Sequence, residues 1–306
     1  MKHVVSVSIG SSNRDHSAQV SFLGENILLE RIGTDGDIEK AIKLISDLDG
    51  KVDAFGMGGI DLYMAGAGKR YMFRDAGRIA AAARRTPLVD GTALKSGLEY
   101  RAVKYASEVE NLAIAGKRVL IACAIDRIGM GEAFEELACK VVYGDLMFAV
   151  GIPIPIHSLS TIHRIAPIAM PIVTRLPFSW LYPTGQAQST GKESGPKKYQ
   201  KYYNEADVLA GDFHYVRRYL PDRIDGKIVI TNTVTSGDVE ELGRRGASTL
   251  VTTTPEVNGR SFGTNVIEAM LVSLIGKPVN EITEKDYFDM LGKLDIKPRI
   301  VRYAKA

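Results

Sequence analysis

The spacing of apolar positions along the chain predicts alternating strands and helices. Residues 4–9 read VVSVSI, a β-branched run that Gly10 closes. Residues 37–51 carry apolar side chains at helical spacing, and Gly50 ends that run. Residues 118–125 form a continuous apolar run, which is typical of a strand buried on both faces of a parallel sheet. The alternation favours an α/β fold.

Residues 1–115 are expected to form an N-terminal α/β domain that binds the substrate. The other elements predicted there are a hairpin over 18–33, a strand that enters a glycine-rich loop over 52–66, and helices over 74–85 and 94–116.

Residues 116–306 are expected to form a second domain with a more regular alternation. Strands are predicted at 118–125, 140–145, 172–178, 207–213, 227–234 and 248–255, with helices at 130–139, 199–206 and 236–247. This pattern predicts a Rossmann-like doubly wound parallel sheet. The polar stretch 185–198 is expected to be a mobile loop, and a long helix is expected to start near 261–264. A last helix and strand either stay here or return to the first domain.

The composition narrows the class of protein. The chain has 306 residues, of which 45% are hydrophobic and 25% charged, so it has enough apolar material to fold rather than stay disordered. Two cysteines exclude a disulfide scaffold. A net charge of +3, from 39 basic and 36 acidic residues, argues against a nucleic-acid partner.

The termini and apolar segments predict a cytoplasmic protein without a membrane partner. The opening MKHVVSVSIG lacks the apolar core of a signal peptide. The most apolar stretch, 146–173, is interrupted by prolines and by charged residues, which disfavours a membrane span. The expected partner is a small-molecule substrate, with a homodimer as the commonest default for such folds and no metal-ligand spacing in the sequence.

Polar residues stand at the ends of the strands predicted in the second domain. In an open α/β sheet, ligands bind beyond the carboxyl ends of the strands. We therefore expect the ligand-binding edge to include Asp126, Arg127, Asp145, Asp212, Asn232, Thr233 and Thr253.

The first of these strand ends carries a glycine pattern. Gly129 and Gly131 have G-x-G spacing at the strand-to-helix junction, where close approach of the backbone to a phosphate is needed. Asp145 suits a ribose 2′-hydroxyl, which favours NAD over NADP. The pattern predicts a dinucleotide cofactor, NAD or NADP. Because Phe134 stands at the third glycine position, a purely structural turn is the alternative.

Two arginines are candidates for binding an anion. Arg127 either contacts a phosphate or forms a salt bridge with Asp126 or Glu132. Arg260 precedes the long helix, where free backbone amides favour a phosphate or carboxylate. The alternative there is ordinary helix capping. The predicted anion- or substrate-binding residues of this segment are Arg260, Ser261, Gly263 and Thr264.

Four residues are candidates for proton transfer. Asp90 precedes a predicted helix, and Lys95 lies at the start of that helix. A lysine–carboxylate pair can move a proton on and off a hydroxyl. His214 follows a predicted strand and titrates near neutral pH. Asp61 follows a glycine-rich loop and is a candidate acid or base for the substrate. The alternatives are solvated loop charges and a surface histidine.

Several segments resemble bacterial quinate 5-dehydrogenases, within the shikimate and quinate dehydrogenase group: SIGSSNRDH, ERIGTDGD, AFGMGGIDLY, GDLMFAVGIPIP and TTTPEVNGRSFGTNVIEA. The resemblance implies an N-terminal substrate domain and a C-terminal NAD(P) domain. It also implies an NAD(P)-dependent oxidoreductase that acts on a small hydroxy acid, such as quinate or shikimate, in an interdomain cleft. The catalytic stretch of that group, N-V-T-x-P-x-K, is absent, so Lys95 is a catalytic candidate by position.

Two other functions remain open from the sequence. The strand at 4–9, its Gly-Ser-Ser turn and the next strand resemble the first phosphate loop of actin-like sugar kinases, which implies an actin-like phosphotransferase. A ligand-binding or sensor protein that has kept a Rossmann scaffold without catalysis is the non-enzymatic alternative.

Overall fold

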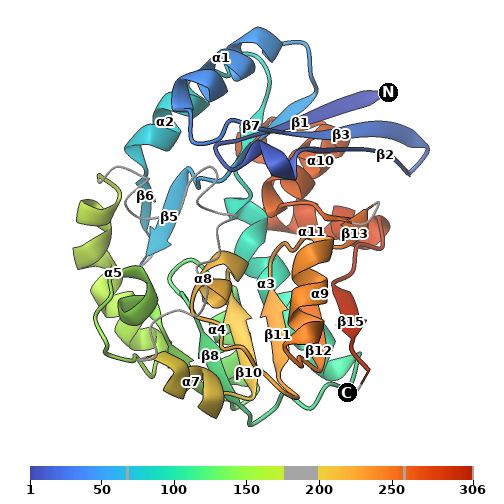
Figure 1. The fold of residues 1–306 in the computed structure, drawn as a ribbon. Coiled ribbons are helices and arrows are strands. Elements are labelled where there is room, and N and C mark those ends of the chain that lie inside the picture. Colours follow the sequence, from blue (N-terminus) through green and yellow to red (C-terminus); the bar gives the residue numbers. More distant parts are fainter. Residues whose placement is uncertain (67–68, 176–198, 258–259, 305–306) are drawn as a thin grey trace. The chain divides into compact units, whose positions relative to one another are not determined.

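The chain divides into two units, each of them an α/β structure (Figure 1). The computed structural model describes residues 1–66, 69–175, 199–257 and 260–304. The first unit comprises Met1–Leu94, Ala169–Thr190 and Gly263–Ile296, and the second comprises Lys95–Ile168, Gly191–Phe262 and Lys297–Ala306. The sequence predicts a single boundary near residue 115. In the structure, each unit instead consists of three segments that alternate along the chain.

The first unit is built on a five-stranded sheet with the order β2-β3-β1-β4-β7. Strand β1 is parallel to both of its neighbours, β3 and β4, whereas β2 is antiparallel to β3. The predicted hairpin is confirmed, and its turn has positive φ angles of 52° and 81° at Leu23 and Gly24. The strands are β1 Lys2–Ser8, β2 His16–Phe22, β3 Glu25–Gly33, β4 Ala54–Gly58 and β7 Leu88–Val89.

The long helix predicted near 261–264 is confirmed, but it belongs to the first unit. Helix α10, Thr264–Ile275, packs against β1 and β4. A Cβ on Gly56 would lie 2.8 Å from the Asn265 carbonyl oxygen, so glycine permits this close contact. The other elements of the unit are η1 Ser12–Arg14, α1 Ile38–Leu48, the hairpin β5 Tyr63–Gly66 and β6 Lys69–Met72, α2 Arg74–Ala80, η5 Val279–Glu281 and α11 Glu284–Lys293.

The second unit is built on a six-stranded sheet with the order β15-β12-β11-β10-β8-β9. Five strands are parallel, and β15 pairs antiparallel with β12 at one edge. Numbered along the chain, the parallel strands lie in the order 2-1-3-4-5, a doubly wound, Rossmann-like arrangement, as predicted. The strands are β8 Arg118–Ile121, β9 Lys140–Tyr143, β10 Val208–Gly211, β11 Ile228–Thr231, β12 Thr249–Thr252 and β15 Arg299–Arg302.

The strand predicted at 172–178 is wrong. Residues 172–173 end helix α5, Leu159–Val173, and residues 176–178 lie outside the described residues. A short apolar run does not by itself distinguish a buried strand from a helix, which explains the error. The sixth strand of the sheet is instead β15. The loop predicted at 185–198 also lies outside the described residues.

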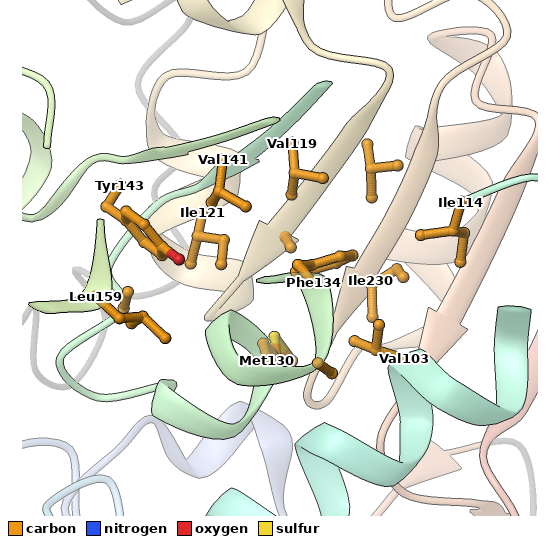
Figure 2. Packing of buried hydrophobic residues seen from close by; sticks show 14 of the residues in the cluster. Val103, Ile114, Val119, Ile121, Met130, Phe134, Val141, Tyr143, Leu159 and Ile230 are labelled. Atoms are coloured by element: carbon orange, nitrogen blue, oxygen red, sulfur yellow. The ribbon is translucent and has the colours of Figure 1, made fainter. Parts of the chain in front are cut away.

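One face of the second sheet packs against helices α3, α4 and α5, and together they form a single apolar core (Figure 2). Val119 and Ile121 of β8 contact this core, as do Met130 and Phe134 of α4. Alternate residues of a strand point to opposite faces, so the continuous apolar run at 118–125 buries both sides. The helices are α3 Thr92–Glu108, α4 Ile128–Glu136, α7 Gln200–Glu205, α8 Phe213–Arg218 and α9 Ser236–Arg244; η2 Asp145–Ala149 and the β13–β14 hairpin, Glu256–Val257 and Arg260–Ser261, complete the unit.

Within the described residues, no helix has both the length and the apolar character needed to cross a membrane.

Candidate functional site

The strand order places a switch point between β8 and β10 in the second unit. These strands are neighbours, and the chain leaves β8 toward β9 on one side but continues from β10 toward β11 on the other. Ligands of doubly wound sheets bind at such a point, beyond the carboxyl ends of the strands. The residues that follow here are the β8–α4 turn, residues 122–127, and Asp212 after β10.

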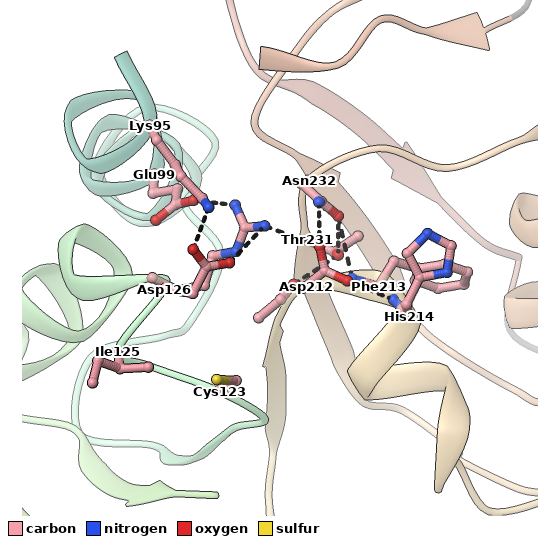
Figure 3. Close-up of polar contacts among 12 residues, drawn as sticks. Lys95, Glu99, Cys123, Ile125, Asp126, Asp212, Phe213, His214, Thr231 and Asn232 are labelled. Atoms are coloured by element: carbon pink, nitrogen blue, oxygen red, sulfur yellow. Dashed lines mark hydrogen bonds and ion pairs between the residues drawn. The ribbon is translucent and has the colours of Figure 1, made fainter. Parts of the chain in front are cut away.

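A charged cluster lies at this switch point: Lys95, Glu99, Asp126, Arg127 and Asp212 (Figure 3). Lys95 and Glu99 are one turn apart on α3, so they share a face of the helix. Lys95 Nζ donates to Asp126 Oδ1, and both side chains are largely buried, at 13% and 8% exposure.

Arg127 connects the members of the cluster. Its Nη1 donates to Glu99 Oε1 at 2.5 Å, and its Nη2 donates to Asp212 Oδ2 at 2.9 Å. Asn232, after β11, donates from Nδ2 to the same Asp212 oxygen at 2.7 Å. Arg127 is 5% exposed, so this cation is held by carboxylates rather than by water.

The carboxylates of the cluster differ in their preferred charge. Burial raises the pKa of Glu99 to about 7, although Arg127 and Lys95 oppose the rise. Burial also acts to raise the pKa of Asp212, but Arg127 and His214 outweigh it and hold that pKa at about 2. Asp212 therefore stays ionised, whereas Glu99 changes charge near neutral pH.

The structure brings together Lys95, Asp126, Arg127 and Asn232 of the predicted site residues. His214 lies beside them, because its backbone N–H donates to Asp212 Oδ1 at 2.9 Å at the start of α8. Thr253 is buried, and its N–H donates to the Thr231 carbonyl at 3.0 Å, while Thr233 is partly buried after β11. In the described part of the chain, no group of three His, Cys, Asp or Glu residues is placed to hold a metal ion.

Asp90 and Asp61 belong to the first unit, whereas Lys95 belongs to the second. Asp90 is a capping residue: it accepts hydrogen bonds from the Thr92 N–H at 3.0 Å, the Thr92 hydroxyl at 2.7 Å and the Leu62 N–H at 2.5 Å. Lys95 pairs with Asp126 in the second unit, and its partnership with Asp90 stays a prediction. Asp61 is partly buried in the segment between β4 and β5.

The predicted anion site at Arg260 is divided between two elements. Ser261 ends strand β14 and pairs with Glu256 of β13. Gly263 is the N-cap of α10 and Thr264 is its first residue, with no side-chain cap there among the described residues. The Arg260 side chain lies outside the described part of the chain, so the anion site stays a prediction.

The two glycines of the G-x-G pattern are used for helix packing. A Cβ on Gly129 would lie 1.9 Å from the Ser96 carbonyl oxygen of α3. A Cβ on Gly131 would lie 2.8 Å from the Leu159 side chain of α5. Neither glycine has a positive φ angle. The spacing therefore lets α4 approach its neighbouring helices, which is a structural role.

A carboxylate of the protein occupies the amides of the β8–α4 turn. Asp145 Oδ1 accepts hydrogen bonds from the N–H groups of Ala124, at 3.0 Å, and Ile125, at 2.8 Å. Burial raises the pKa of Asp145, and these amides oppose the rise. In a dinucleotide-binding turn, a phosphate is expected at such amides and the acid at a ribose hydroxyl. Here the Asp145 carboxylate occupies the amides at which the phosphate would be expected.

The end of β9 is closed by buried aromatic rings. Phe148, three residues after Asp145, stacks on Tyr219 with ring centroids 5.1 Å apart and lies nearly perpendicular to the Tyr199 ring, with centroids 5.2 Å apart. A Cβ on Gly144 would lie 2.3 Å from the Phe148 ring. With the glycines and Asp145 engaged by the protein, the residues of this turn do not fit a dinucleotide bound through the G-x-G pattern.

The first unit does not have the expected phosphate loop of an actin-like kinase. Strand β3 lies between β1 and β2, so the strands that flank the Gly-Ser-Ser turn do not pair with each other. The Ser12 N–H donates to Asp35 Oδ1 at 2.8 Å, and the Gly10 N–H donates to the Ser8 hydroxyl at 3.1 Å. These amides are taken by side chains of the protein, which disfavours a phosphate there.

Sequence reasoning missed Glu99, whereas Asp212 was among the residues expected at the strand ends. Glu99 has one signal in the sequence, its position four residues after Lys95 on a predicted helix. Asp212 lies near the end of the strand predicted at 207–213, and the rule about strand ends applies to it as it does to Asp126.

The fold and the site define a two-unit α/β protein with a polar switch-point edge in its second unit. The chain belongs to the family described as a domain of unknown function (DUF8754), whose model matches residues 93–303. Residues 3–90 match a second domain of unknown function (DUF8753). No curated protein sequence matches the chain.

Solved structures with some likeness to the chain are distant. The glucose-galactose binding protein GanP from Geobacillus stearothermophilus is 12% identical, with a TM-score of 0.42 over 98% of this chain and 97% of that one. A hetero-hexameric glutamate dehydrogenase from Thermus thermophilus is 14% identical, with a TM-score of 0.42 over 96% of this chain and 74% of that one. Likeness at this level does not indicate an activity.

Proposed function

We propose that the second unit binds a small polar molecule beyond the carboxyl ends of β8 and β10, and that Lys95 and Asp126 exchange a proton with one of its hydroxyl or carbonyl groups. The observation that carries this proposal is the largely buried Lys95–Asp126 ion pair at the switch point of the sheet. An ammonium donates a proton and a carboxylate accepts one, so such a pair suits acid–base catalysis on a hydroxyl.

The remaining members of the site would hold Asp212 at the same edge of the sheet. Arg127 holds Asp212 in place from one side, and Asn232 holds it from the other. Because hydrogen bonds to a carboxylate are directional, these two contacts fix the position of the Asp212 side chain at the end of β10. A small ligand at this edge would meet a fixed arrangement of donors and acceptors.

A small hydroxy acid such as quinate or shikimate is the substrate class that we propose, on the resemblance to the shikimate and quinate dehydrogenase group. Oxidation of its hydroxyl would require a hydride acceptor, and NAD(P) is the acceptor implied by that resemblance. The β8–α4 turn does not support a dinucleotide bound through Gly129 and Gly131, so the proposal assigns binding and proton transfer to the chain and no step to the cofactor.

Ligand binding without catalysis is the second candidate function. The observation that favours it is the engagement of Gly129, Gly131 and Asp145 in contacts within the protein. In this case, the Lys95–Asp126 pair would contribute hydrogen bonds to the ligand and no chemistry.

Thermal melting of the purified protein with quinate, shikimate, NAD, NADP and ATP, each alone, tests the proposal. A ligand at 100 times its dissociation constant stabilises the folded protein by about 2.7 kcal/mol, which is a measurable shift. We expect a shift with a hydroxy acid. Lys95→Met should abolish that shift, and Lys104→Met should preserve it, because Lys104 pairs with Glu108 farther along the same helix.

The other outcomes are informative as well. A shift with NAD or NADP alone would contradict the argument from the β8–α4 turn. A hydroxy-acid shift that survives Lys95→Met would remove the ion pair from the site. Oxidation of the bound hydroxy acid in the presence of NAD or NADP, followed by absorbance, separates the catalytic function from simple binding.

A further inference from the structure

Glu99 is a buried carboxylate that takes no part in the proposed proton transfer. The residue is 1% exposed, and its Oε1 accepts a 2.5 Å hydrogen bond from Arg127. Its Oε2 has no hydrogen-bond partner within the described residues, and the same holds for Arg127 Nε. The contact is therefore single rather than the bidentate pairing that Arg and carboxylate commonly form, which leaves the ionised carboxylate incompletely stabilised.

Charged groups from three elements surround the contact between Glu99 and Arg127. Lys95 comes from its own helix, and Asp126 and Arg127 come from the β8–α4 turn. Asp212, after β10, binds the other end of the Arg127 guanidinium. With Glu99 ionised, the cluster has two cations and three carboxylates, so one negative charge is in excess. With Glu99 protonated, the charges balance.

This arrangement makes Glu99 the group that responds to added charge. Asp212 is fixed by Arg127, Asn232 and the His214 N–H, and Asp126 is paired with Lys95. Glu99 accepts one hydrogen bond and contacts one cation, whereas Asp126 contacts two cations and Asp212 accepts three hydrogen bonds, so protonation of Glu99 costs least. Its pKa of about 7 agrees with this view, because burial opposes ionisation there.

We infer, on the basis of the proposed function, that Glu99 is a positioning residue that takes up a proton when an anionic ligand reaches the Lys95–Asp126 pair and releases it when the ligand leaves. The proton comes from solvent and forms a neutral carboxyl group. That change keeps the cluster from gaining a second excess negative charge. If the Glu99–Arg127 contact only held α3 to the β8–α4 turn, the carboxylate would stay ionised throughout.

The first experiment follows the Glu99 side-chain carboxyl by ¹³C NMR in the ligand-free protein, with Glu99→Gln to assign the signal. Between about pH 5 and about pH 9, we expect it to titrate with a midpoint near neutral pH. Lys95→Met should move the midpoint upward, because it removes a cation that favours the ionised form. Lys104→Met should leave the midpoint unchanged. A carboxylate that stays ionised down to the acid limit, or a midpoint insensitive to Lys95→Met, would overturn the inference.

The second experiment measures proton uptake on binding of quinate by calorimetry near neutral pH, in two buffers of different ionisation enthalpy. We expect uptake of up to about one proton by the wild type and none by Glu99→Gln. Binding without uptake overturns the inference and leaves the proposed function standing. Failure of quinate to bind counts against the proposed substrate, and the ligand-free titration then decides the role of Glu99 by itself.

Discussion

At the scale of single residues, Arg127 shows how partners determine a role. The sequence allows a phosphate contact or a salt bridge, and the structure makes Arg127 the buried centre of the charged cluster. Its partner Glu99 lies 28 residues away in the chain, and Asp212 lies 85 residues away. No local pattern can indicate such partners, because they meet only after the sheet and α3 have assembled.

Replacing Arg127 should be costly for stability. Arg127→Met would leave Glu99 and Asp212 buried without their cation, so we expect the free energy of unfolding to fall by about 3–5 kcal/mol. Arg118→Met is the matched control, because it breaks a more exposed pair with Asp207 and should cost at most about 1 kcal/mol. Urea unfolding measures both. Equal losses in the two variants would contradict the buried role of Arg127.

At the scale of elements, the two glycines of α4 allow this helix to pack closely against its neighbours. The G-x-G pattern predicts a phosphate-binding turn, yet the Gly129 and Gly131 positions face α3 and α5. A glycine pattern indicates that another group comes close to the backbone, but it does not indicate whether that group is a ligand or another part of the protein. At this strand end, the close neighbour is another part of the chain.

Gly129→Ala therefore tests the packing of α4. The added methyl group would overlap the Ser96 carbonyl, and we expect a loss of about 1–3 kcal/mol in the free energy of unfolding. Gly292→Ala in α11 is the control, since no described atom lies within 4 Å of its Cβ position. That variant should gain up to about 1 kcal/mol from helix propensity. If thermal melting shows no loss for Gly129→Ala, the packing role is wrong.

At the scale of the whole molecule, the chain passes between the two units several times, so each unit is built from separate segments of the sequence. Helix α11 belongs to the first unit, and the strand that follows it, β15, completes the sheet of the second. Arg299 and Arg302 of this strand form ion pairs with Glu256 at 2.5 Å and Glu110 at 2.8 Å. The second unit therefore depends on the last residues of the chain.

Deleting residues 297–306 should destabilise the second unit selectively. Without β15, one edge of β12 loses its backbone hydrogen bonds, so its amides should exchange with solvent faster. We expect hydrogen–deuterium exchange to rise in β12 and β11, with little change in β1 and β4 of the first unit. A uniform rise in both units would show that the truncation unfolds the whole chain instead.

The sequence by itself determined the types and order of most elements and the α/β class, because apolar periodicity is a property of consecutive residues. It also indicated Asp126, Arg127 and Asn232, because strand ends are visible in the same pattern. Only the tertiary structure decided that residues 172–173 are helical, that β15 completes the second sheet, that Gly129 packs against α3, and that Lys95 pairs with Asp126. Each of these depends on which distant segments come into contact, and burial then sets the charge of a residue such as Glu99.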